Sequence, residues 1–308
     1  MEIITGTEDF YLEEPTAVAI GKFDGVHVGH RRLLEEILER RQRGLKACVF
    51  TFDPAPAVFF GVSDRMELTT REEKRQILEL MGVDILIEFP MNRKTTGIPA
   101  RSFVSELLTD RMNAAFIAAG RDVTFGAGGA GNAALLEEMA KENGYEVRLI
   151  DKVCMGGREV SSTYVRETVE KGEMDLVQHL LGIPYMIGGT VSHGRQFGRS
   201  LGMPTANLLP PAEKLLPPAG VYFSRVVLSG QRYSAITNIG KKPTVAGGEE
   251  PWGVETFIYD LREDISGAQI QVELHDFRRP ERKFDSVGML RDQMEQDLEA
   301  GRKYWKII

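Results

Sequence analysis

The stretch "VAIGKFDGVHVGHRRLLEEIL" (Val18–Leu38) indicates how the first half of this chain folds. A short β-rich run, Thr16–Ile20, leads into a loop with three glycines and two histidines. Apolar residues at the spacing of one helical face follow, so we expect a helix that begins near His30. A strand that ends in a glycine-rich loop and enters a helix predicts an anion site, because helix N-termini favour negative charge.

The residue types of this loop suit a polyphosphate. Gly21, Gly25 and Gly29 allow the backbone to approach an anion without obstruction by a Cβ atom. His27 and His30 lie three residues apart across a tight turn, so both are expected to point at the same anion. An imidazole donates a hydrogen bond to a phosphate oxygen and, when protonated, offsets charge that develops in phosphoryl transfer. Capping and packing roles for both histidines remain the alternative.

The rest of the first half alternates between strands and helices. Further strands are expected at residues 47–52, 83–89, 114–120 and 145–151, with helical patterns between them. Such alternation predicts a Rossmann-like α/β domain with a parallel sheet. After about Gly182 the pattern changes to short strands, so we expect a first domain at residues 1–183 and a second at 184–308.

The second half predicts a small antiparallel β-barrel with a C-terminal helix. Val221–Leu228 and Gln231–Ile239 flank a Ser-Gly turn and predict a hairpin. Gly253–Asp260 and Ala268–Phe277 predict another hairpin, and the final amphipathic helix is expected to begin at Asp285.

Composition excludes several functional classes. The net charge of −7 argues against a dedicated nucleic-acid binder. No run approaches eighteen apolar residues, so no membrane span is expected. The two cysteines, Cys48 and Cys154, lack the spacing of a disulfide framework or zinc site and fit a reducing compartment. These features predict a cytoplasmic enzyme.

Two further stretches suggest nucleotide chemistry. "VSSTYVR" (Val160–Arg166) follows a strand and opens a helix, so its backbone N–H groups and Arg166 are expected to face an anion, although a simple cap is the commoner use of such a motif. "GGTVSHGRQFGRSLGMPTANL" (Gly188–Leu208) combines phosphate-compatible glycines with Thr205 and Asn207, whose oxygens suit Mg²⁺.

A glycine pattern at residues 126–131 offers a different interpretation. Gly126, Gly128 and Gly131 form a G-x-G-x-x-G pattern, and Asp151 follows about twenty residues later. This combination is typical of dinucleotide-binding proteins. The preceding strand ends near Gly120, however, and a nicotinamide dehydrogenase would leave both histidines without a role. We therefore expect these glycines to form a mobile loop beside the nucleotide pocket.

Together these motifs resemble the bacterial bifunctional riboflavin kinase/FAD synthetase family. "HVGH" and "SSTYVR" resemble the two signatures of H-x-G-H nucleotidyltransferases, and residues 21–34 match the family pattern "GxFDGVHxGHxxLL" without a gap. "TFDPAP" (51–56), "GRDVTFG" (120–126), "GRSLGMPTAN" (198–207), "NIGKKPT" (238–244), "VET" (254–256) and "FRRPERKF" (277–284) resemble further family blocks. The resemblance covers nearly the whole chain.

The resemblance implies an adenylyltransferase in the first domain, which converts FMN and ATP into FAD and pyrophosphate. It makes His27 and His30 catalytic and Asp122 and Phe125 flavin-binding. The residues that it assigns to ATP and phosphate in this domain are Gly21, Phe23, Asp24, Gly25, Gly29, Ser162, Thr163 and Arg166.

The resemblance implies a riboflavin kinase in the second domain, which makes FMN and ADP from riboflavin and ATP. Glu255 is then the catalytic base, and Thr205 and Asn207 hold Mg²⁺. Gly194, Arg199 and Gly202 are assigned to ATP, and Asn238 and Arg279 to the flavin. Nucleic acid and membranes are not expected as partners, and the chain is expected to be a monomer or weak homo-oligomer.

The chain departs from the family pattern at several positions. Ala55 stands where the family usually has a histidine, and Val123 stands where it has an aromatic residue. The loop 126–131 lacks the basic residue that the family usually has there. Phe257 and Ser266 stand where histidine and tyrosine are common. Because the first domain lacks these family residues, one alternative is a riboflavin kinase whose first domain is only weakly active or regulatory. A different small-substrate nucleotidyltransferase with an appended barrel and a nucleotide-responsive RNA binder are the remaining alternatives.

Overall fold

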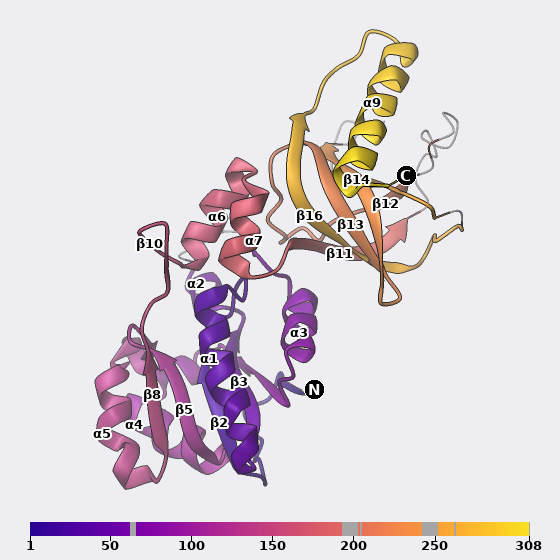
Figure 1. Ribbon diagram of the computed structural model, residues 1–308. Helices are drawn as coiled ribbons and strands as arrows, with labels where there is room; N and C mark the ends of the chain where they lie inside the picture. The colour runs from indigo at the N-terminus through magenta and orange to yellow at the C-terminus, as the bar shows by residue number, and fades with distance from the viewer. Residues whose placement is uncertain (62–65, 193–202, 204, 242–251, 262, 308) are drawn as a thin grey trace. The chain divides into compact units, whose positions relative to one another are not determined.

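The computed structural model describes residues 1–61, 66–192, 203, 205–241, 252–261 and 263–307 (Figure 1). The chain forms two compact units, one made of residues 1–66 and 71–162 and the other of residues 67–70 and 163–308. The domain boundary at residues 183/184 stays a prediction.

The first unit contains a six-stranded sheet in which every neighbouring pair is parallel. In spatial order its strands are β1 (Glu2–Thr5), β4 (Ile85–Pro90), β3 (Lys46–Asp53), β2 (Thr16–Ile20), β5 (Ala114–Gly120) and β8 (Glu146–Ile150). The predicted parallel α/β sheet is thereby confirmed. Strand β1 was not predicted, because four residues are too few to show an alternating pattern.

Helices cover both faces of this sheet. The helical segments are α1 (Val28–Glu39), η1 (Arg40–Arg43), α2 (Pro56–Phe59), α3 (Arg71–Leu80), η2 (Thr95–Gly97), α4 (Ala100–Ser102), η3 (Phe103–Arg111), η4 (Ala127–Gly129) and α5 (Ala133–Asn143). Two small ribbons pair β6 (Thr124–Phe125) with β7 (Gly131–Asn132) and β9 (Cys154–Met155) with β10 (Arg158–Glu159).

The period of two in a strand explains how the sheet buries both faces. Val18 and Ile20 of β2 join a core cluster that includes side chains from η3 and α5. Ala17 and Ala19 alternate with them and lack exposure, and α1 contacts β2, β3 and β5. The small alanines let α1 lie close to the sheet, and that contact fixes where the N-terminus of α1 stands.

The second unit contains a closed antiparallel barrel. Its strands in spatial order are β11 (Tyr185–Ser192), β12 (Ala206–Leu208), β15 (Trp252–Ile258), β14 (Gln231–Lys241), β13 (Gly220–Leu228) and β16 (Gln269–Pro280). Helices α6 (Ser162–Lys171) and α7 (Met174–Leu181) precede the barrel, and α9 (Val287–Trp305) follows it. The predicted fold class, a parallel sheet followed by an antiparallel barrel and a C-terminal helix, is confirmed.

Only one of the two predicted hairpins exists. β13 and β14 pair around Ser229 and Gly230, which both have positive φ as a tight hairpin turn requires. The predicted pairing of β15 with β16 is wrong, because β15 pairs with β12 and β14 whereas β16 pairs with β11 and β13. Strand β16 joins the two ends of the sheet and so closes the barrel.

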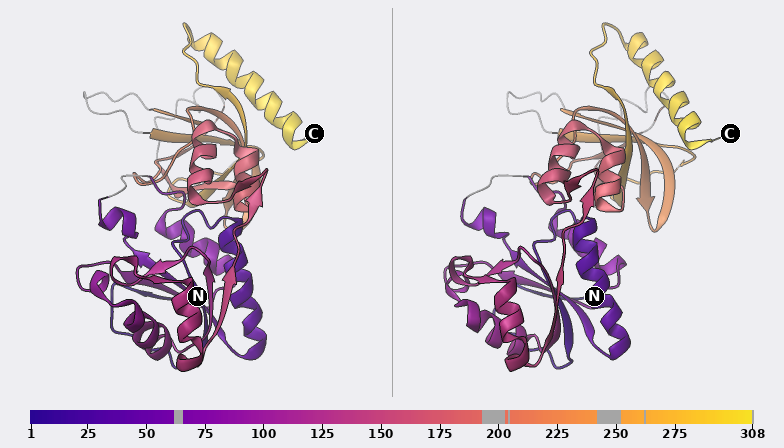
Figure 2. Two further views of the ribbon diagram at one scale, coloured as in Figure 1. Left: turned by 90° about the vertical axis from the view of Figure 1, so that its left-hand side faces the viewer. Right: turned by 60° about the vertical axis from the view of Figure 1, so that its left-hand side comes forward.

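Helix α9 lies along the outside of the barrel, against β13 and β14 (Figure 2). Its N-cap is Ser286 rather than the predicted Asp285, and the Ser286 side chain accepts from the backbone N–H of Met289. Leu290, Met294 and Leu298 form one stripe of the helix, as predicted, and face the barrel pocket. Within the described part of the chain, no helix is long and apolar enough to cross a bilayer.

Candidate active sites

The glycine loop of the first unit follows β2 with an unusual backbone. The N–H of Gly21 donates to the carbonyl oxygen of Phe50 on β3 (3.2 Å), which extends the sheet into the loop. Phe23 and Val26 have φ of 51° and 44° and are fully buried. Positive φ is costly for a β-branched or bulky residue, and such strain concentrates at functional sites. The packing of these two side chains holds the loop in one conformation.

The two histidines meet at the start of α1. His27 is the N-cap, and its Nδ1 accepts from the backbone N–H of His30 at 3.3 Å. The two rings stack with centroids 3.8 Å apart, and the ring of Phe23 lies 5.0 Å from that of His30. A Cβ on Gly29 would lie 3.1 Å from the His27 ring, so a side chain there would require that ring to shift by a few tenths of an ångström. The capping role of His27 is thereby confirmed, and its catalytic role stays a prediction.

Burial keeps both imidazoles neutral. Desolvation lowers the pKa of His27 from 6.5 to about 4 and lowers the pKa of His30 well below its usual value. Because Nδ1 of neutral His27 accepts a hydrogen bond, its proton lies on Nε2. A neutral Nε2–H donor suits a phosphate oxygen, and the charge of a bound phosphate would raise both pKa values.

A hydrogen bond joins the two nucleotidyltransferase-like motifs. The Ser162 hydroxyl donates to the carbonyl oxygen of Asp24 at 2.9 Å, across 138 residues of sequence. Ser162 thus supports the glycine loop in addition to starting α6. Thr163 and Arg166 continue α6 in the second unit, and their roles stay predictions.

The residues predicted to bind flavin in the first unit differ in exposure. Asp122 is exposed, and its carboxylate lies 3.4 Å from the Lys152 ammonium. Phe125 is 3% exposed and stacks on Phe103 in the core, so its ring does not face solvent in this structure. A Cβ on Gly131 would lie 2.3 Å from the Phe125 ring, which assigns that glycine a packing role.

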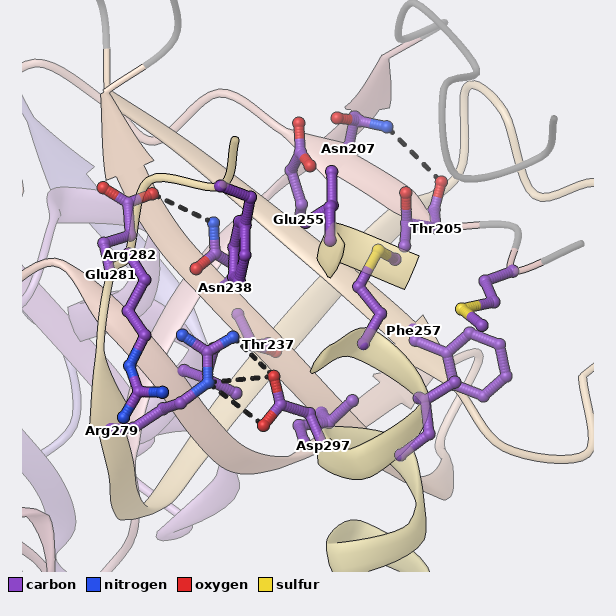
Figure 3. Close-up of a pocket in the computed structure, with 17 residues that line it drawn as sticks. Thr205, Asn207, Thr237, Asn238, Glu255, Phe257, Arg279, Glu281, Arg282 and Asp297 are labelled. Carbon is purple, nitrogen blue, oxygen red and sulfur yellow. Dashed lines mark hydrogen bonds and ion pairs between the residues drawn. The ribbon is translucent and has the colours of Figure 1, made fainter. Parts of the chain in front are cut away.

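The second unit contains a pocket of about 360 Å³ between the barrel wall and α9 (Figure 3). It brings together five residues singled out from sequence: Thr205, Asn207, Asn238, Glu255 and Arg279. Eight apolar side chains line it as well: Met203, Val221, Ile236, Phe257, Phe284, Leu290, Met294 and Leu298. A pocket that combines an apolar lining with a few convergent polar groups is typical of a small-molecule site.

Strand register explains why three of the polar groups meet. On β15, Glu255 pairs with Asn207 of β12 on one side and with Asn238 of β14 on the other. Residues directly opposite in antiparallel strands share a face, so a carboxylate lies between two amides at this end of the pocket. A base with polar neighbours on both sides is well placed to receive a proton from a bound hydroxyl.

The residues at this end fit a hard cation. Asn207 is buried, and its Nδ2 donates to the Thr205 carbonyl oxygen at 3.4 Å. The Ser192 hydroxyl donates to the Asn207 carbonyl oxygen at 3.1 Å and fixes the strand. The donor set of hydroxyl, amide and carboxylate oxygens is the one that Mg²⁺ prefers. Gly194, Arg199 and Gly202 lie outside the described residues.

The pocket also contains charged residues that the sequence analysis missed. Asp297 of α9 accepts from Arg279, and Glu281 accepts from the Asn238 amide at 3.2 Å. Asp297 interrupts the apolar stripe of α9, since it directly precedes Leu298 and follows Met294 by three residues. A charged residue on the apolar face of a helix is rarely buried without a partner, so this position could have identified Asp297 as a candidate site residue from the sequence.

Comparisons with known proteins show the family to which the chain belongs. The FAD synthetase family model matches residues 11–164, and the riboflavin kinase family model matches residues 181–305. The bifunctional riboflavin kinase/FMN adenylyltransferase of Escherichia coli (strain K12) is 36% identical over 310 residues, which span 99% of this chain and 98% of the relative. The chain belongs to the bifunctional riboflavin kinase/FMN adenylyltransferase family.

Other members and one solved structure extend the comparison. The Bacillus subtilis (strain 168) bifunctional riboflavin kinase/FMN adenylyltransferase is 30% identical, with 94% of this chain and 92% of the relative covered. A crystal structure from Streptococcus pneumoniae, described as a macrolide-efflux protein, is 30% identical with a TM-score of 0.85 over 97% of this chain and 98% of that one. Membership in the riboflavin kinase/FMN adenylyltransferase family therefore extends over both units.

Proposed function

We propose that this chain makes FMN from riboflavin and ATP in its second unit and FAD from FMN and a second ATP in its first. The observation that carries this function is the barrel pocket, which gathers Thr205, Asn207, Asn238, Glu255 and Arg279 from four separate stretches. Each of these stretches was identified from sequence by its resemblance to a riboflavin kinase block. Family models for the two activities match the two halves of the chain.

In the kinase reaction, Glu255 accepts the proton of the ribityl 5′-hydroxyl as its oxygen attacks the γ-phosphorus of ATP. The bond from that oxygen to phosphorus forms while the bond to the β-phosphate oxygen breaks, which gives FMN and ADP. Thr205 and Asn207 would hold Mg²⁺, which neutralises phosphate charge when bound. The apolar side chains of the pocket exclude water from the isoalloxazine ring.

In the adenylyltransferase reaction, a phosphate oxygen of FMN attacks the α-phosphorus of ATP, and pyrophosphate leaves. His27 and His30 stabilise the phosphates as neutral hydrogen-bond donors, because burial disfavours their charged forms. Backbone N–H groups of the glycine loop support the same phosphates, and we assign Ser162, Thr163 and Arg166 to the departing pyrophosphate. No covalent enzyme intermediate is required, so positioning supplies most of the rate enhancement.

The test is to incubate the purified protein with riboflavin, ATP and Mg²⁺ and to separate the flavins by chromatography. FMN together with FAD is expected. His27→Ala should abolish FAD formation and spare FMN formation, and Asn207→Ala should do the reverse when FMN is supplied. Each activity thus serves as the folding control for the other.

Other outcomes of that assay would contradict the proposal in recognisable ways. FMN without FAD would indicate a kinase whose first unit is weak or regulatory. Neither product would refute both activities. A folded single variant that loses both would refute the division of labour. We further propose that the chain acts in the cytoplasm as a monomer or weak homo-oligomer.

A further inference from the structure

Asp297 is a buried carboxylate with an unusually large number of hydrogen-bond partners. The residue is 5% exposed, on the side of α9 that faces the barrel. Its Oδ1 accepts from Arg278 Nε at 2.8 Å, Arg279 Nε at 3.1 Å and Gln293 Nε2 at 3.2 Å. Its Oδ2 accepts from Arg279 Nε at 3.0 Å and Arg279 Nη2 at 2.5 Å. A carboxylate has about four acceptor positions, so these contacts use nearly all of its capacity.

A β-bulge allows two consecutive arginines to reach the same carboxylate. Successive side chains of a regular strand point to opposite faces, which would send Arg278 and Arg279 apart. The register between β13 and β16 shifts here, because Val221 pairs with Arg279 and Tyr222 pairs with Phe277. Arg278 is the extra residue, and bulges of this kind redirect side chains beside active sites.

The Asp297 cluster lies at the end of the pocket away from the expected chemistry. Figure 3 shows Arg279 and Asp297 well separated from Thr205, Asn207 and Glu255. The latter residues are assigned to the phosphates and the reacting hydroxyl. The part of riboflavin at the Arg279 end is therefore the isoalloxazine ring, whose carbonyl oxygens accept hydrogen bonds from a guanidinium.

We propose that Asp297 is a positioning residue for riboflavin binding: it holds the Arg279 guanidinium and the adjacent turns of α9 as the ring-binding end of the kinase pocket. This inference rests on the proposed kinase function. Three donors of Arg279 point at Asp297 or at the Pro280 carbonyl oxygen, 2.9 Å from Nη1, so the plane of the guanidinium is fixed. A fixed donor binds a carbonyl oxygen with little loss of side-chain entropy.

The C-terminal half of α9 has other attachments that should preserve the fold without Asp297. The Tyr259 hydroxyl donates to the Leu298 carbonyl oxygen at 2.6 Å, and the Trp305 indole donates to the Ala235 carbonyl oxygen at 3.0 Å. Phe223 and Tyr304 stack with centroids 4.1 Å apart. Loss of the Asp297 carboxylate should thus loosen the pocket end of the helix rather than release the whole helix.

The test is a steady-state kinase assay on the full chain, with riboflavin as the varied substrate and FMN as the measured product. Asp297→Asn keeps the side-chain shape but leaves two guanidinium groups without a counter-charge. We expect the riboflavin KM to rise at least tenfold and kcat to stay within threefold. Asp292→Asn, at an exposed position of the same helix, is the matched control and should behave as the wild type. Adenylylation of supplied FMN checks that the chain is intact.

A second substitution separates an electrostatic role from simple packing. Adding Arg278→Gln to Asp297→Asn removes one of the unpaired guanidinium charges. The riboflavin KM of the double variant should therefore be at least threefold lower than that of Asp297→Asn alone. A purely packing role predicts no recovery, because the added substitution restores no volume. If Asp297→Asn does not yield folded protein, Arg279→Lys is the alternative variant. It keeps the charge without the paired donors, and must also raise KM at least tenfold.

The possible failures are distinguishable. A wild type that forms no FMN refutes the kinase function and this inference with it. A wild type that forms FMN, with an unchanged riboflavin KM in Asp297→Asn, refutes this inference alone. A fall in kcat at constant KM, or no recovery in the double variant, would equally overturn the positioning role.

Discussion

His27 makes the stability of the first unit depend on pH, and the size of the effect follows from its burial. In the unfolded chain its pKa is about 6.5, whereas burial lowers the folded-state pKa to about 4. Between these values the unfolded chain binds a proton that the folded chain does not, so acidification favours unfolding. The folded state loses stability as pH falls below about 6.5, and His27 contributes no pH dependence well above that value.

The loss of stability depends on how far the pH of the experiment lies below the pKa of His27 in the unfolded chain. At pH 5 the unfolded imidazole lies 1.5 pH units below its pKa, and each unit corresponds to about 1.36 kcal/mol, so His27 costs about 2 kcal/mol relative to pH 8. His30 acts in the same direction, because burial and the neighbouring His27 lower its pKa too. The pair therefore makes the first unit acid-sensitive.

The assay is urea unfolding at pH 8 and pH 5, followed by far-ultraviolet circular dichroism. Both tryptophans, Trp252 and Trp305, belong to the second unit, so fluorescence reports that unit separately. His27→Gln should lose about 2 kcal/mol less stability on acidification than the wild type. His179→Gln, at an exposed histidine of α7, is the matched control and should follow the wild type.

A direct measurement of the His27 protonation state tests the interpretation independently. Nuclear magnetic resonance of ¹⁵N-labelled histidine should show His27 neutral at pH 5.5, with its proton on Nε2. Equal losses of stability in wild type and His27→Gln, or an imidazole that titrates near pH 6.5 in the folded protein, would refute the reasoning.

Three substitutions test the packing of the two units, each by urea unfolding. Leu34→Ala, at a fully buried position of α1, should lower the free energy of unfolding of the first unit by about 2–5 kcal/mol. Gly126→Ala should cost more than about 1 kcal/mol, because φ is +71° and the new Cβ would lie 2.6 Å from Ala100 Cα. Thr237→Val should cost the second unit about 1–3 kcal/mol by leaving two buried hydroxyls unpaired, with a shift in the tryptophan transition. An unchanged free energy of unfolding in any of these variants would contradict the contacts assigned to that residue.

The sequence determined those features that depend on neighbouring residues. The strand Thr16–Ile20, the glycine loop and the helix after His27 follow from residue spacing, capping and backbone preference within about twenty residues. The hairpin around Ser229 and Gly230 was predictable for the same reason. Among the residues predicted for the barrel pocket, Thr205 and Asn207 were indicated by their oxygen donors as well as by resemblance. The others came from resemblance alone, and neither argument showed that these residues meet.

Only the tertiary structure decided which distant segments lie together. β15 and β16 are successive in sequence but pair with other strands, because closing the barrel joins β16 to β11 and β13. Asp297 meets Arg278 and Arg279 only because a bulge in β16 turns both toward α9. A local sequence pattern shows which face of a helix or strand is apolar, but the segment that packs against that face is decided by the tertiary fold of the whole chain.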